Sequence, residues 1–60
     1  MQANGERIDA AVLVVEDNID VRRIVCRLLR DFGCTVIEAS SGQVALEILQ
    51  SGRKIDLIFS

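Results

Sequence analysis

Two adjacent carboxylates, Glu16 and Asp17, directly follow the apolar run AAVLVV at residues 10–15. The chain contains no histidine, so this pair offers a hard oxygen site and not a zinc-type site. Mg²⁺ is the cation that proteins bind through one or two carboxylates together with phosphate and water. The pair therefore predicts a Mg²⁺ site with Glu16 and Asp17 as its metal ligands.

A purely structural role competes with this hypothesis. Asp17 or Asn18 is a suitable N-cap for a following helix, and negative charge favours the positive end of a helix. The two roles are compatible with each other. The sequence has neither GxGxxG nor GxxxxGK[ST], so dinucleotide and P-loop binding are poorly supported.

The hydrophobic periodicity predicts the order β-α-β-α-β. Strands are predicted at residues 10–15, 34–39 and 55–60, and helices at residues 18–32 and 40–52. Ser40 and Ser41 are N-cap candidates for the second helix, and Gly33 and Gly52 are typical of helix ends. The apolar stripes expected to face the sheet are Val21, Ile24, Val25, Leu28, Leu29 and Phe32 in the first helix and Val44, Ala45, Ile48 and Leu49 in the second.

The strand compositions predict the topology. The first and third strands are almost continuously apolar and belong inside the sheet, whereas Thr35 and Glu38 interrupt the second, which belongs at an edge. With right-handed crossovers this gives strand order 2-1-3, half of a doubly wound parallel α/β sheet. Ligands of such sheets bind beyond the carboxyl ends of the strands, here between strands 1 and 3, where Glu16 and Asp17 follow strand 1.

Composition favours a globular domain without nucleic-acid affinity. Of the 60 residues, 50% are hydrophobic and 27% are charged, and the net charge is -2. The acidic balance disfavours direct binding to DNA or an anionic membrane. The longest apolar run is too short to cross a bilayer, and the opening residues are not typical of a signal sequence, so we expect a cytoplasmic, reduced protein.

Cys26 and Cys34 show no CxxC spacing. Because small buried cysteines are common in protein interiors, we expect both to pack in the core and not to act as a redox pair. No disulfide or structural metal is then expected to stabilise the fold, so a domain of about 60 residues should be only marginally stable.

Several segments together resemble the amino-terminal half of a response-regulator receiver domain of two-component signalling. They are VLVVEDN, GCTVIEASSGQVALEIL and DLIFS, and the resemblance extends over residues 10–60. It implies a flavodoxin-like fold, with residues 1–7 as a flexible lead-in and residues 8–60 as a receiver domain truncated after strand 3. It also implies that Glu16 and Asp17 hold Mg²⁺ directly or through water.

The resemblance further implies a phosphorelay receiver that accepts a phosphoryl group from a histidine kinase or a histidine phosphotransfer protein. The family's acceptor aspartate would directly follow Ser60, so we assign neither a catalytic residue nor a phosphoacceptor within these residues. Asp56 lies at the start of the third strand, and we do not assign the acceptor role to it. In this family the first helix helps to dock the partner, which points to Ile19 and Arg23. The alternative there is a solvated basic face.

A second class of function remains open. The chain could be a non-phosphorylated interaction module, either a degenerate receiver or a βαβαβ fragment that forms a homodimer through the exposed edge of the third strand. Unpaired edge strands promote such association.

Overall fold

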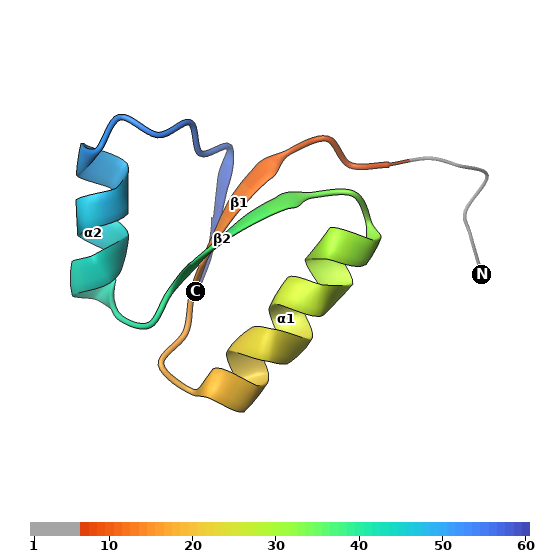
Figure 1. Ribbon diagram of the computed structural model, residues 1–60, viewed down its shortest axis with the longest axis horizontal. Coiled ribbons are helices and arrows are strands. Elements are labelled where there is room, and N and C mark those ends of the chain that lie inside the picture. Colours follow the sequence, from red (N-terminus) through yellow and green to blue (C-terminus); the bar gives the residue numbers. More distant parts are fainter. Residues whose placement is uncertain (1–6) are drawn as a thin grey trace.

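The computed structural model describes residues 7–60 and contains three strands and two helices (Figure 1). They are β1 (Ala11–Val15), α1 (Ile19–Asp31), β2 (Thr35–Ala39), α2 (Gly42–Gln50) and β3 (Leu57–Phe59). Residues 1–6 of the predicted flexible lead-in lie outside the described residues. The predicted β-α-β-α-β order is confirmed.

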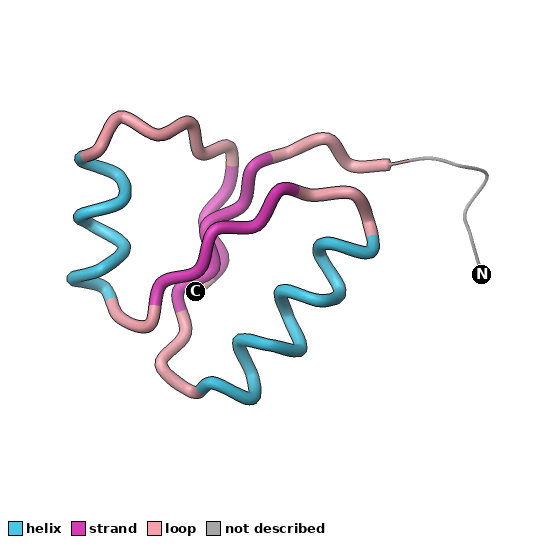
Figure 2. The backbone as a smooth tube through the Cα atoms, viewed as in Figure 1, coloured by secondary structure: helices cyan, strands magenta, loops and turns pink. Residues whose placement is uncertain are grey.

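The three strands form one parallel sheet in the order β2-β1-β3. Leu13 of β1 lies beside Ile37 of β2 and Ile58 of β3. The predicted strand order is therefore confirmed. Figure 2 shows the three strands side by side at the centre of the molecule, with a helix on either side.

Burial of β1 on both faces accounts for its central position. Val12, Leu13 and Val14 are at most 3% exposed. Side chains alternate between the faces of a strand, so Val12 and Val14 pack with Cys26 beneath α1, whereas Leu13 packs with Ala45 beneath α2. One strand thus connects two small cores.

Local sequence sets the ends of both helices. The Asn18 side chain caps α1, and the Ser41 side chain caps α2. Of the two predicted serine caps, Ser41 is therefore correct. Gly33 and Gly52 adopt φ values of 94° and 82° just beyond the helices, a conformation that glycine reaches without steric cost. Within residues 7–60, no helix combines the length and apolarity needed to cross a bilayer.

Within the described residues the third strand pairs with β1 alone, and its interior position in a larger sheet stays a prediction. β3 begins at Leu57 and not at residue 55, and it forms an outer strand of the sheet. Neither helix packs on it, so Leu57, Ile58 and Phe59 remain 59%, 55% and 46% exposed. An apolar composition suits burial on both faces, but residues 7–60 supply no layer over this strand.

The predicted apolar stripe of α1 is only partly covered. Val25 and Leu29 pack against the core beside Cys26. The remaining four members of the predicted stripe are 43–61% exposed: Val21, Ile24, Leu28 and Phe32. They remain open because α1 lies over β1 and β2 and leaves the β3 side of that face bare. On α2, Val44, Ala45 and Ile48 pack as predicted, whereas Leu49 is 40% exposed.

Both cysteines pack in the α1-side core, as predicted. Cys26 and Cys34 are free thiols that lie within one cluster of buried residues. Burial raises the pKa of Cys26, and the nearby Glu38 carboxylate acts in the same direction. The thiol form is therefore favoured, as expected for a packing residue.

Replacing Leu13 with alanine tests the importance of the central strand. Leu13 is 0% exposed, so Leu13→Ala should lower the free energy of unfolding by about 2–5 kcal/mol. Ile24→Ala, at a position that is 61% exposed, should change it by less than about 0.5 kcal/mol. Denaturant titration followed by circular dichroism measures both; equal losses would contradict the described core.

Candidate functional site

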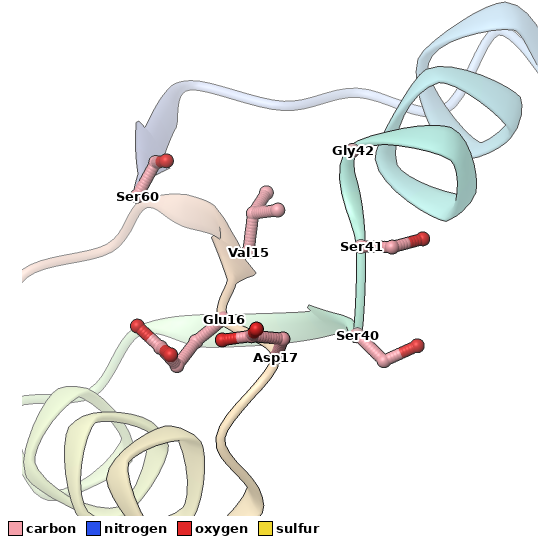
Figure 3. A pocket seen from close by; sticks show the side chains of 7 residues that line it. All are labelled: Val15, Glu16, Asp17, Ser40, Ser41, Gly42 and Ser60. Atoms are coloured by element: carbon pink, nitrogen blue, oxygen red, sulfur yellow. The ribbon is translucent and has the colours of Figure 1, made fainter.

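A pocket of about 420 Å³ opens at the carboxyl ends of the strands (Figure 3). Its lining comes from the residues after β1, the β2–α2 connection and the residue after β3: Val15, Glu16, Asp17, Ser40, Ser41, Gly42 and Ser60. This is the position predicted for a ligand site, and it contains both predicted metal ligands. The contribution of Ser40, Ser41 and Gly42 was not predicted, because serines at this position are typical of a helix N-cap.

Glu16 is held in place by three hydrogen bonds. Its N–H donates to Ala39 O at 3.0 Å, and its carboxylate accepts from the Asn18 N–H at 3.1 Å. Its carbonyl oxygen accepts from Arg22 Nη1 at 2.6 Å. The backbone that carries the acidic pair is thus tied to both β2 and α1.

Asp17 is exposed and does not cap the helix. The cap is Asn18, whose Oδ1 accepts from the N–H groups of Asp20 and Val21, both at 3.0 Å. Among residues 7–60, no hydrogen bond to the Asp17 carboxylate is formed. The competing structural role therefore belongs to Asn18, which leaves the Asp17 carboxylate at the pocket.

Arg22 is a structural determinant of the site that the sequence reasoning missed. Its side chain is 13% exposed and bridges the Glu16 carbonyl to the Glu38 carboxylate, with Nε 3.2 Å from Oε1. Arg30 approaches the other oxygen of Glu38 at 3.4 Å. The available signal was spacing, because Arg22 falls on the same helix face as the buried Cys26 and the partly buried Leu29.

The donor set of the pocket suits a hard cation that retains other ligands. Figure 3 shows the Glu16 and Asp17 carboxylates extending to the same side, whereas the side chains of Ser40 and Ser41 are directed away from them. In the part of the chain from residue 7 onward, no group of three potential metal-ligating side chains is present. Two carboxylates fit Mg²⁺ only if water and a phosphate oxygen complete its octahedral coordination.

The amino-terminal end of α2 borders the same pocket through Ser41 and Gly42. A helix N-terminus carries partial positive charge and favours anions. The pocket therefore combines an acidic side that suits a cation with an electropositive side that suits phosphate. This combination is suited to a phosphoryl group accompanied by a metal ion.

Asp56 lies at the opposite end of the sheet from the pocket. Its carboxylate accepts from the Ala11 N–H at 2.7 Å, and its N–H donates to Ala11 O at 2.8 Å. These bonds hold it at the amino end of β1. The predicted position of Asp56, at the end of the sheet away from Glu16 and Asp17, is confirmed.

The two predicted docking residues lie on the surface of α1. Ile19 is 49% exposed, and Arg23 is also exposed. Arg30, on the same helix, is paired with Glu38. The docking role of Ile19 and Arg23 stays a prediction.

No family model matches the sequence, and no solved structure matches the chain. The resemblance to receiver domains therefore rests on the sequence motifs alone.

Replacing Arg22 with methionine tests whether it anchors the acidic loop. Methionine retains an apolar stem but removes the guanidinium, so Arg22→Met should lower the free energy of unfolding by about 1–3 kcal/mol. It should also accelerate hydrogen exchange at the Glu16 amide. Arg23→Met is the matched control on the exposed side of α1 and should shift the unfolding free energy by less than about 0.5 kcal/mol. Identical exchange in the two variants would contradict the anchoring role.

Proposed function

We propose that this chain is the amino-terminal part of a phosphorelay receiver domain with a flavodoxin-like, doubly wound fold, and that Glu16 and Asp17 hold Mg²⁺ there. The observation that carries the proposal is the placement of Asp17. Asn18 alone caps α1, and the Asp17 carboxylate remains available beside Glu16 at the pocket. Strand order 2-1-3 supports the proposal because it creates a ligand position at this edge.

Phosphoryl transfer depends mainly on positioning and charge neutralisation. When bound, Mg²⁺ would supply positive charge to neutralise the phosphoryl oxygens. The chain's own residues would hold the ion and orient the group. The Arg22 and Ala39 contacts fix the Glu16 backbone, while the α2 N-terminus lies on the other side of the pocket.

The acceptor of the phosphoryl group would come from the position after Ser60. Ser60 directly follows β3 and lines the pocket, so the next residue would leave the strand at the same edge as the acidic pair. We propose an aspartate there, phosphorylated by a histidine kinase or a histidine phosphotransfer protein that docks near Ile19 and Arg23. The reading frame past Ser60 tests this directly. An aspartate codon is expected, and any other codon would eliminate aspartyl phosphorylation at that position.

Removal of one carboxylate should weaken binding of the metal. Asp17→Asn keeps the size of the side chain but removes a charged ligand, so the dissociation constant for Mg²⁺ should rise at least about tenfold, equivalent to about 1.4 kcal/mol. Isothermal titration of the 60-residue chain with MgCl₂ measures this change.

The matched control is Asp31→Asn, which removes the same charge from an exposed position at the end of α1. Its Mg²⁺ affinity should stay within about twofold of the original value, because charges separated by more than about 10 Å are screened in 0.1 M salt. Equal weakening in the two variants would show only a general effect of charge. Unchanged affinity in Asp17→Asn would remove the metal-binding proposal.

One observation favours the second class of function, an interaction module. The outer edge of β3 is apolar and uncovered by either helix. Self-association through this edge does not require Mg²⁺ or phosphorylation.

A further inference from the structure

We propose that Glu38 of β2 acts through Arg22 as a positioning residue for the acidic pair of the pocket. The inference rests on the proposed Mg²⁺ site and extends it to a residue that does not line the pocket. Glu38 is the only charged residue of β2, and its sequence position indicated no more than an edge strand. Three features support the inference: the fixed orientation of the Glu38 carboxylate, the bridge formed by Arg22 and the backbone that carries the acidic pair.

Two arginines of α1 hold the Glu38 carboxylate. Glu38 lies beside Val14 in the sheet and shares the α1 face of β2 with Val36, because side chains alternate along a strand. Its Oε1 lies 3.2 Å from Arg22 Nε, and its Oε2 lies 3.4 Å from an Nη atom of Arg30. Each oxygen therefore has its own donor, and the carboxylate has a defined orientation.

Arg22 connects this carboxylate to the loop after β1. Its side chain is 13% exposed, and its Nη1 donates to the Glu16 carbonyl oxygen at 2.6 Å. The guanidinium group is planar and rigid, so a contact at Nε also fixes the direction of Nη1. Without Glu38, the long Arg22 side chain would regain rotational freedom and spend less time at the Glu16 carbonyl.

The end of β2 thus holds Glu16 on both sides of its backbone. The Glu16 N–H donates to Ala39 O at 3.0 Å, and Ala39 directly follows Glu38. The Glu16 carbonyl, held by Arg22, belongs to the planar peptide group that joins Glu16 to Asp17. Fixing that plane also fixes the position from which the Asp17 side chain extends.

Asp17 depends on this backbone for its orientation. Within residues 7–60 its carboxylate accepts no hydrogen bond, because Asn18 caps the helix. Groups that orient metal ligands typically change metal affinity about 10–100-fold when they are removed. Loss of Glu38 should therefore weaken Mg²⁺ binding although Glu38 does not touch the ion.

A simple stabilising ion pair is the competing role for Glu38. Its side chain is 39% exposed, and ion pairs between exposed groups contribute little to stability. Such a pair would not alter the Mg²⁺ affinity of the folded chain. A general effect of charge, in contrast, would depend on the negative charge of Glu38 and not on its ability to accept a hydrogen bond.

Two substitutions of Glu38 separate these roles by isothermal titration with MgCl₂. Glu38→Leu keeps an apolar stem but has no acceptor, and it should raise the dissociation constant at least about fivefold. Glu38→Gln lacks the charge but keeps an oxygen that accepts from Arg22, so the constant should stay within about twofold of its original value. Glu47→Leu, at an exposed position of α2, is the matched control and should also stay within about twofold.

A double-mutant cycle tests whether Glu38 acts through Arg22. Arg22→Met should raise the dissociation constant for Mg²⁺ at least as much as Glu38→Leu does. Addition of Glu38→Leu to Arg22→Met should change the constant by no more than about twofold, because the bridge is already lost. Independent roles would instead multiply the two single effects.

Hydrogen exchange of the metal-free chain in EDTA gives a readout that does not depend on Mg²⁺. Glu38→Leu should accelerate exchange of the Glu16 amide, whereas Glu38→Gln and Glu47→Leu should leave its rate within about twofold. Circular dichroism identifies any variant that fails to fold. If Glu38→Leu is one, Glu38→Val replaces it in every measurement, because valine also lacks an acceptor and favours strands.

Three results would overturn the inference: unchanged Mg²⁺ affinity in Glu38→Leu, equal weakening in Glu38→Leu and Glu38→Gln, or multiplied effects in the double variant. Each of these results leaves the Mg²⁺ site itself intact. Absence of Mg²⁺ binding by the unmodified chain would instead overturn the proposed function. In that case the exchange rates, measured without metal, still decide whether Glu38 positions the acidic pair.

Discussion

Burial of β1 on both faces is the constraint on which the rest of the structure depends. Val12 and Val14 anchor the α1 side, while Leu13 anchors the α2 side. The strand must therefore be central, and its carboxyl end must emerge between the connections that lead into the two helices. The acidic pair at Glu16 and Asp17 follows directly from that geometry, since it occupies the first two positions after the strand.

Contacts between α1, β2 and the loop after β1 hold the residues of the site in place. Arg22 uses one guanidinium to hold both the Glu16 carbonyl and the Glu38 carboxylate, so α1, β2 and the acidic loop form one connected unit. The Asn18 side chain accepts hydrogen bonds from the first N–H groups of α1, so the Asp17 carboxylate does not serve as the helix cap. The proposed metal site has only two carboxylates as protein ligands, and such anchoring would reduce the entropy lost on binding.

The sequence predicted element order, strand order and the position of the pocket because periodicity and crossover handedness depend on local patterns. It did not predict that Ile24 and Leu28 of α1 would be exposed, since an apolar stripe indicates a preference for burial but not the presence of a covering layer. It also missed Arg22, because an arginine on an amphipathic helix is ordinarily a surface residue. The ion pair between Arg22 and Glu38 can be recognised only when α1 and β2 are placed side by side. Both shortcomings concern tertiary contacts.

A hard divalent cation held by the proposed Glu16–Asp17 site would lie at the carboxyl edge of the sheet. Paramagnetic Mn²⁺ prefers the same oxygen ligands as Mg²⁺, so NMR spectra of the unmodified chain during an MnCl₂ titration locate that ion residue by residue. Binding at the acidic pair should broaden the amide signals of Glu16, Asp17 and Ser60 early, whereas those of Ala11 and Asp56, at the opposite end of the sheet, should remain sharp. Broadening that begins at Ala11 and Asp56, or that spreads evenly over the chain, would contradict it.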